Sequence, residues 1–395
     1  MSGIRERGRL QFEVAGVFDP LVGALNGRSW LLIEGAKISK VGARPQPGVE
    51  VNRKYAQAYA VPGLIDCHVH LSFDPSVNNP VDALERSTAA EVADVVRRMA
   101  RLALLAGVTT VRDLGDPHYL VSELRRELLR VPAPTIVSSG PPITTANGHC
   151  HFFGGAVTPS GDHLQRAVAE RAKRGVDVVK VMINGGILTP GSNPGKMQFS
   201  RAALAEIASA AKSDGLPIAA HAYTSEGISA AIQMGASTIE HCSFVTHDEY
   251  LWDWEAIVSA AQSPCYISPT LVDRPGVRQD PSRLSWRKSM VQHLYHNGAK
   301  LVAGTDSGVL RGLGPDSLPW ALLAMHDAGI PSLECIAAGT IRAAEACGLS
   351  GTKGLIAAGY DADLVLVEKD PARNLGTLVK PLAVVARGKL YDPEG

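Results

Sequence analysis

The sequence predicts an α/β protein: a TIM-like (β/α)8 barrel over residues 61–350, with a small β-sandwich built from residues 1–60 and 351–395. Two observations favour this fold. The middle of the chain alternates short apolar runs with amphipathic stretches, which is typical of a (β/α)8 barrel. Both ends contain short alternating runs interrupted by Gly and Asp, which indicates antiparallel strands. A doubly wound open sheet is the alternative, but no Gly-x-Gly-x-x-Gly follows its first strand.

The middle of the chain contains eight strand candidates, each a short apolar run of the kind that buries both faces in a parallel sheet. They are 61–68, 108–113, 134–139, 176–183, 217–222, 237–241, 264–270 and 299–305. Amphipathic helices are expected in 81–106, 162–174, 201–214, 282–297 and 333–347. Terminal strands are expected in 12–19, 30–42, 362–368 and 383–391.

Composition narrows the classes of protein. The 39 basic and 39 acidic side chains among 395 residues give no electrostatic reason to expect nucleic acid or an anionic membrane as partner. No apolar run approaches the roughly 18 residues of a spanning helix, and no apolar signal segment follows the first residues. The six cysteines lack paired spacing. We therefore expect reduced thiols in a cytoplasmic protein that acts on a small-molecule or peptide substrate. The oligomeric state, a homo-oligomer included, is left open.

The most informative feature is a set of short apolar segments that each end in a metal-ligand residue type. They are 61–70, 178–182, 219–223, 239–242 and 302–306. His68 and His70 lie two residues apart, so the period of a strand directs both imidazoles to one face. The segments also bring Lys180, His221, His241 and Asp306 to strand ends. Such side chains at one edge of a sheet predict a site for one or two divalent metals.

Two motifs carry a resemblance that covers nearly the whole chain. Residues 62–70 read Pro-Gly-Leu-Ile-Asp-Cys-His-Val-His, and residues 359–367 read Gly-Tyr-Asp-Ala-Asp-Leu-Val-Leu-Val. With them the chain resembles the amidohydrolase superfamily, in the subgroup of imidazolonepropionase-like and prolidase-like amidohydrolases. The binuclear type of that family has His-x-His on strand 1, a carboxylated lysine on strand 4, histidines on strands 5 and 6, and an aspartate on strand 8. This chain matches at His68, His70, Lys180, His221, His241 and Asp306.

Lys180 and Asp306 each have two interpretations. A free ammonium is costly to bury in an apolar strand, so Lys180 either reaches the barrel mouth and pairs with a carboxylate or is chemically modified. The resemblance implies a carbamate formed with carbon dioxide, an anion able to bridge two metals. Asp306 lies in Thr-Asp-Ser, which suits the N-cap of a following helix. The resemblance implies instead a metal ligand that takes the proton from the attacking water and gives it to the leaving nitrogen.

Candidate substrate-binding residues lie after strands 3, 5, 7 and 8. The loop after strand 3 contains His149 and His151. The resemblance to the subgroup implies that one of these histidines, by preference His151, contacts the substrate. The alternative is that the two histidines only order the loop. Tyr223 could donate to an oxyanion, or simply pack at the rim. Arg274 and Arg311 could clamp a carboxylate, or be solvated surface arginines.

Two further segments are expected near the substrate. The glycine-rich stretch 185–195 lacks the Gly-Lys-Ser/Thr of a phosphate loop and is interpreted as a loop that covers the substrate. Residues 244–256 are longer than the link expected after strand 6, and their Trp252 and Trp254 either line an enlarged pocket or cover the barrel side.

Together these features predict a metal-dependent hydrolase of a C–N bond, amide or peptide-like, in which metal-bound hydroxide attacks and Asp306 moves the proton. Zinc is the expected metal. The resemblance implies dipeptides, N-acyl amino acids or modified peptides as substrates. A cyclic amidine or imidazolone hydrolase, a cyclodehydratase, and a carbamate, urea or lactone hydrolase stay open as alternatives. A catalytically silent scaffold is the rival from another class, and the six filled ligand positions argue against it.

Overall fold

A set of parallel strands forms the centre of the molecule. The computed structural model describes residues 9–22, 24–244 and 252–393. The parallel strands are β8 (Leu64–Val69), β9 (Val108–Asp113), β10 (Thr135–Ser138), β13 (Val179–Met182), β14 (Ile218–Ala222), β15 (Thr238–His241), β16 (Tyr266–Ser268) and β17 (Lys300–Leu301). They form two sheets with the orders β10-β9-β8 and β13-β14-β15-β16-β17. Each predicted strand of the middle region is therefore confirmed, although β17 is shorter than 299–305.

Short contacts link the edges of the two parallel sheets. Val69 forms an isolated parallel bridge with Ser307, just beyond β17, and Ile143 forms one with Val181 on β13. The backbone N–H of Cys67 donates to the carbonyl of Ala303 (2.9 Å). The strand that carries His68 and the segment that leads to Asp306 are thus neighbours, although more than two hundred residues separate them.

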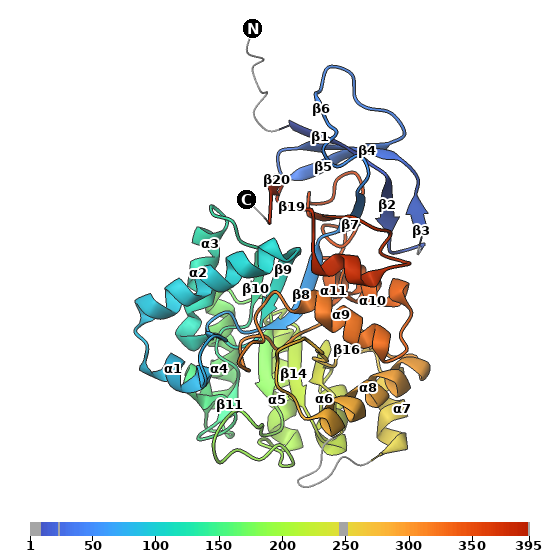
Figure 1. Ribbon diagram of the computed structural model, residues 1–395. Coiled ribbons are helices and arrows are strands. Elements are labelled where there is room, and N and C mark those ends of the chain that lie inside the picture. The colour runs from blue at the N-terminus through green and yellow to red at the C-terminus, as the bar shows by residue number, and fades with distance from the viewer. Residues whose placement is uncertain (1–8, 23, 245–251, 394–395) are drawn as a thin grey trace.

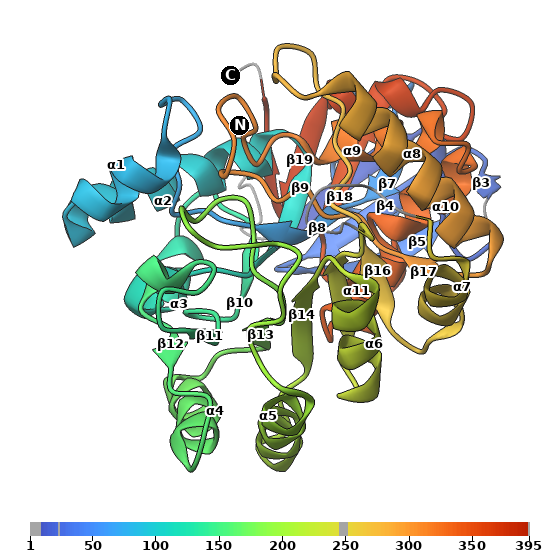
Figure 2. The ribbon, with the colours of Figure 1, turned by 90° about the horizontal axis from the view of Figure 1, so that it is seen from below.

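Helices lie outside these strands (Figure 2). They are α1 (Pro80–Arg86), α2 (Ala89–Leu105), α3 (Leu120–Leu128), α4 (His163–Arg174), α5 (Arg201–Ser213), α6 (Ser225–Gln233), α7 (Trp254–Gln262), α8 (Pro281–His296), α9 (Leu318–Asp327), α10 (Ser332–Ala338) and α11 (Ile341–Ala346). The remaining short elements are β11 (Thr144–Thr145), β12 (Ala156–Val157), η1 (Pro117–Tyr119), η2 (His151–Phe153) and η3 (Leu375–Val379). Within the described residues, no helix combines the length and apolar character needed to cross a membrane.

Two stretches that were predicted as single helices are each divided into two helices in the structure. The stretch 81–106 is two helices, because Thr88 begins a new one: its side chain accepts from the backbone N–H of Glu91 while Glu91 reaches back to the N–H of Thr88. Such a capping box is typical of a helix N-terminus, because it satisfies two backbone N–H groups that lack a partner within the helix. The stretch 333–347 is likewise divided, into α10 and α11. Helices α3, α6, α7 and α9 were not among the predicted helices.

Strands from both ends of the chain lie together at one end of the molecule (Figure 1). One sheet has the order β5 (Lys37–Gly42), β4 (Ser29–Glu34), β1 (Arg9–Val14), β6 (Val51–Asn52). The other has the order β20 (Lys389–Tyr391), β19 (Ala383–Ala386), β18 (Leu364–Val367), β7 (Tyr59–Pro62), β2 (Gly16–Asp19), β3 (Ala24–Asn26). One hydrophobic cluster includes Phe12 and Leu31 from the first sheet and Val17 and Leu364 from the second.

One strand of the second sheet continues into the centre of the molecule. β7 pairs with the C-terminal strand β18 and is separated from β8 by Gly63 alone. A side chain at Gly63 would collide with Thr109, since a Cβ there would lie 2.1 Å from its Oγ1. Glycine is therefore required where β7 connects to β8. This connection determines where β8 begins and so where His68 lies along the strand.

We expect Thr88→Ala to lower the free energy of unfolding by about 1 kcal/mol, because the first turn of α2 loses its cap. Urea denaturation of the two proteins would measure the change. Thr88→Ser retains the hydroxyl and is the matched control, with a loss of only a few tenths of a kcal/mol. Equal stability of Thr88→Ala and the native protein would contradict the capping assignment.

Candidate metal centre

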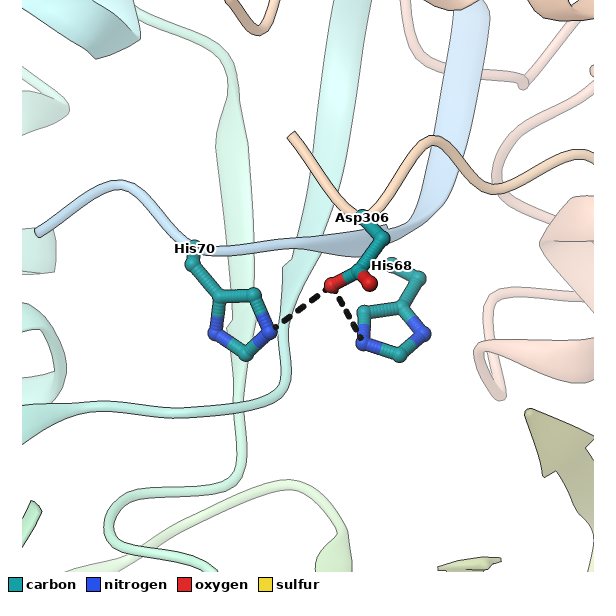
Figure 3. Close-up of side chains that lie close together, drawn as sticks. All are labelled: His68, His70 and Asp306. Atoms are coloured by element: carbon teal, nitrogen blue, oxygen red, sulfur yellow. Dashed lines mark ion pairs between the residues drawn. The ribbon is translucent and has the colours of Figure 1, made fainter. Parts of the chain in front are cut away.

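Three of the predicted ligands form a tight group (Figure 3). One ligand atom each of His68, His70 and Asp306 lies within 4.8 Å of the others. Oδ1 of Asp306 is 3.4 Å from Nε2 of His68 and 3.2 Å from Nε2 of His70. Both imidazoles are buried, whereas the Asp306 side chain is about 24% exposed. The carboxylate is therefore the most exposed member of the group.

The remaining predicted ligands surround this group. The ring of His241 lies 5.3 Å from that of His68 and 4.7 Å from that of His221, measured between centroids. Lys180 is fully buried on β13 and lines the same cavity. The structure thus brings all six predicted ligand positions into one cavity, with His68, His70 and Asp306 as the closest set among the described residues.

Three of the four candidate histidine ligands have one ring nitrogen held by a neighbour at 3.0 Å or less. Nδ1 of His68 is 2.9 Å from Oε2 of Glu240, Nδ1 of His241 is 3.0 Å from Oγ1 of Thr270, and Nε2 of His221 is 3.0 Å from the carbonyl of Gly185. A held N–H fixes the tautomer, so that the opposite nitrogen keeps its lone pair for a metal. This is the arrangement expected of ligating histidines.

Glu240 holds His68 through a buried ion pair. Its other oxygen, Oε1, accepts from Nη2 of Arg112 at 3.0 Å, and both side chains are buried. Although burial acts to raise it, the pKa of Glu240 is held well below its usual range by Arg112 and His68. The carboxylate stays ionised, which is the state that orients an imidazole beside a metal.

Lys180 has a buried amine without a hydrogen-bond partner. Its Nζ makes none with any described residue. Burial lowers the pKa of Lys180 to about 8. The interpretation in which the lysine tip pairs with a carboxylate at the barrel mouth is therefore wrong for the described residues. A buried nitrogen of this kind is costly to leave unsatisfied, and a lowered pKa raises the fraction of neutral, nucleophilic amine.

Backbone geometry fixes Asp306. Its φ is +55°, in the left-handed region that few non-glycine residues adopt. The backbone N–H groups of Thr305 and Asp306 both donate to the carbonyl of His68, at 3.2 and 2.8 Å. Asp66 holds the turn, since its carboxylate accepts from the N–H and the hydroxyl of Thr305 at 3.1 and 2.7 Å. The N-cap interpretation is wrong, because α9 begins only at Leu318, after Ser317.

Burial and neighbouring charges give the residues of the cavity different protonation states. Burial lowers the pKa of His68 to about 4 and that of His149 to about 3, so both rings are neutral at pH 7. Burial opposes ionisation of Asp306, yet the nearby His68 and His70 hold its pKa below the usual value. Burial raises the pKa of Tyr223, which keeps its phenol protonated as a donor.

The cavity above these residues has a volume of about 450 Å³. His149 and Tyr223 line it, and the ring of His149 lies 4.7 Å from that of His221. His151 does not line it: its Nδ1 is 3.0 Å from the carbonyl of Gly148. The preference for His151 over His149 as the substrate contact therefore needs correction, because the loop directs the first histidine inward.

The glycine-rich loop after β13 borders the cavity, as expected. Ile187 and Leu188 line it. Gln198 fastens the base of the loop, donating to the carbonyls of Met182 and Asn184 at 2.7 and 3.0 Å.

The two predicted arginines do not line the cavity. Arg274 donates through both terminal nitrogens to Asp316, at 2.6 and 2.7 Å, and is thereby neutralised. Arg311 is exposed and donates to the side chain of Asn78 at 2.6 Å. Their predicted contact with substrate stays a prediction, which these positions outside the cavity do not support. Arginines from the segment before α8 and from α8 itself line the cavity instead: Arg278, Arg283 and Arg287.

The two tryptophans after strand 6 cover the side of the molecule. Trp252 stacks on Trp254 at 5.2 Å between centroids and lies 4.3 Å from Trp286 on α8. Neither lines the cavity. The enlarged-pocket interpretation is therefore wrong for these two side chains, and residues 245–251 of the same segment lie outside the described residues.

The chain belongs to the amidohydrolase family, whose model ("Amidohydrolase family") matches residues 59–390. Among its relatives, ochratoxinase of Aspergillus niger is 27% identical over 430 residues, covering 96% of this chain and 86% of the relative. Imidazolonepropionase of Xanthomonas axonopodis pv. citri is 24% identical over 397 residues, covering 91% and 89%. The chain is a hydrolase that acts on C–N bonds.

A solved structure supports the fold. The crystal structure of a Xaa-Pro dipeptidase with bound methionine in the active site superposes with a TM-score of 0.82 at 24% identity. The match covers 97% of this chain and 100% of that one. The fold is accordingly a TIM-like α/β barrel.

Sequence reasoning missed the residues that support the ligands. Asp66, Arg112 and Glu240 are charged residues inside strands whose every residue is buried. That position was the available signal, because a charge in a buried strand requires a partner. Asp113 is a similar case: its carboxylate accepts from the N–H groups of Leu71 and Gly115 at 2.8 and 3.1 Å, beside His70.

We expect Gly115→Ala to weaken metal binding by about 10- to 100-fold, since a Cβ there would lie 2.6 Å from Nδ1 of His70 and must displace the ring. Metal content by plasma mass spectrometry and competition with a chromogenic chelator would measure it. Gly42→Ala, where the nearest atom to a Cβ is 3.7 Å away, is the matched control. If Gly115→Ala bound metal as tightly as the native protein, His70 would not be a metal ligand.

Proposed function

We propose that the chain is a metal-dependent amidohydrolase that cleaves the amide bond of a dipeptide, an N-acyl amino acid or a modified peptide. One observation carries the proposal: the buried amine of Lys180, without a hydrogen-bond partner among the described residues, lies in the same cavity as the four predicted histidine ligands and Asp306. The similarity to ochratoxinase and imidazolonepropionase supports C–N bond cleavage.

The residues fit one or two divalent ions. His68, His70 and Asp306 would hold one, and His221 and His241 would contribute to a second. Lys180 would add a further ligand if carbon dioxide had converted its amine to a carbamate. A buried amine of lowered pKa suits that modification, which turns a costly cation into a two-oxygen anion. Zinc is the ion that imidazole and carboxylate ligands favour here. When bound, such an ion acidifies water and polarises a carbonyl.

The chain's own residues then bind the substrate and move the proton. Asp306 is ionised and partly exposed, so it can accept the proton of the attacking water and return it to the nitrogen as the C–N bond breaks. Tyr223 retains its proton and can donate to the carbonyl oxygen as negative charge develops there. Neutral His149 lies beside His221 and can contact the same group. Ile187 and Leu188 provide an apolar wall for the acyl part.

Hydrolysis of a cyclic amidine or imidazolone is the second candidate, favoured by the similarity to imidazolonepropionase. The same residues would serve, with the proton of Asp306 delivered to a ring nitrogen. Turnover of a linear amide panel beside a cyclic panel separates the two. Greater kcat/KM on cyclic substrates would replace the amide proposal.

The domain division follows from the same interpretation. We infer that residues 61–350 close into one barrel, and that residues 1–60 and 351–395 form one β-sandwich beside it. The bridges between the edges of the parallel sheets and the shared hydrophobic cluster of the terminal sheets support this division.

We expect Asp306→Asn to retain the fold and lose turnover by about 100- to 10,000-fold, because an amide cannot shuttle the proton. Steady-state kinetics on an amide substrate would measure it, with circular dichroism for the fold. Asp273→Asn removes a carboxylate that pairs with Lys288 outside the cavity and is the control. Turnover near the native rate in Asp306→Asn would refute its proton role.

We expect Lys180→Ala to lose bound metal, with part of the metal and activity restored by formate or propionate if a bridging carbamate was present. The small acid would occupy the space left by the side chain. Lys212→Ala, on α5, is the control. Metal content equal to that of the native protein would count against a bridging role.

A further inference from the structure

Helix α8 presents two arginines to the cavity. Arg283 and Arg287 are four residues apart, which places them on the same face of a helix, and both line the cavity. The order β13-β14-β15-β16-β17 puts α8, which follows β16, well away from the loop after β13. The cavity therefore has a cationic side at α8 and an apolar side at Ile187 and Leu188, with the candidate metal ligands between them.

Arg287 is held by the backbone and connects α8 to the candidate metal ligands. Its Nη2 donates to the carbonyl of Pro269 at 2.9 Å and to the hydroxyl of Thr270 at 3.1 Å. The same hydroxyl lies 3.0 Å from Nδ1 of His241. This chain of contacts fixes the distance from the helix face to His241.

Arg283 is different, because its guanidinium has no hydrogen-bond or ion-pair partner within the described ranges. Two neighbouring carboxylates have partners of their own, and one of them, Asp280, also lines the cavity. Oδ1 of Asp280 accepts from the backbone N–H groups of Ser282 and Arg283 as the cap of α8, at 2.8 and 3.1 Å. Asp273 pairs with Lys288 at 2.8 Å. A cation thus faces the cavity with its donors available.

We propose that Arg283 binds a free carboxylate of the substrate and makes the enzyme selective for N-acyl amino acids over neutral amides. A guanidinium presents paired N–H donors that match the two oxygens of a carboxylate. In an N-acyl amino acid that carboxylate belongs to the leaving amine. Arg283 therefore orients the nitrogen that departs, while the acyl group lies toward Ile187 and Leu188. This assignment rests on the proposed function and replaces Arg274 and Arg311 as the carboxylate clamp.

The test compares N-acetyl-L-leucine with N-acetyl-L-leucinol, in which a hydroxymethyl group replaces the carboxylate and a single amide bond is retained. We expect Arg283→Gln to reduce kcat/KM on the acid by about 10- to 100-fold, mainly through KM, and to leave the alcohol within about twofold. Arg283→Lys should restore part of the loss. Lys288→Gln removes a cation from the same helix outside the cavity and should change neither substrate.

Calorimetric binding of the two compounds to the metal-loaded native, Arg283→Gln and Lys288→Gln proteins provides a second readout that does not need turnover. Equal effects of Arg283→Gln on acid and alcohol, or no effect on either, overturn the role of Arg283 while amide cleavage stands. A native enzyme that cleaves neither compound nor any other linear amide overturns the proposed function, and this assignment with it.

Discussion

The buried carboxylate of Glu240 is the interaction on which the rest of the centre depends. It joins β9 to β15 through Arg112 and β15 to β8 through His68, with every partner out of water. A buried carboxylate is tolerated only when paired, and removing one partner of a buried pair costs about 3–5 kcal/mol. The three strands are therefore held in one register by a charge that also orients a ligand, so stability and metal chemistry share the same atoms.

The centre combines neutral bases with one accessible acid. Burial lowers the pKa of His68, His221 and His241, which preserves lone pairs for an ion, and leaves the Lys180 amine poorly solvated. Two of the candidate ligands, His241 and Asp306, have a left-handed backbone, with φ of +69° and +55°. Strained backbone at such a position is tolerated when the surrounding hydrogen bonds determine it, and beside Asp306 these are the two that Thr305 donates to the carboxylate of Asp66.

Much of the fold and the candidate ligand set could be predicted from sequence, because each ligand lies within or at the end of an apolar run and parallel strands end at a common edge. His68 and Lys180 are examples. The partners could not be predicted. Nothing in the local sequence shows that Glu240 selects Arg112, or that Asp316, far along the chain, neutralises Arg274. Which of His149 and His151 turns inward depends on a loop conformation, whereas Thr88 did carry a readable cap within 81–106.

The direct connection from β7 through Gly63 to β8 limits how the terminal segments of this chain can be rearranged. The C-terminal strand β18 is hydrogen-bonded along β7, and β7 runs without a hinge into the strand that bears His68. The first and last segments are therefore linked: loss of β18 would leave β7, and with it the start of the strand that bears His68, without a hydrogen-bonded neighbour on that side. Grafting this barrel onto another terminal module would require both segments to move as a pair.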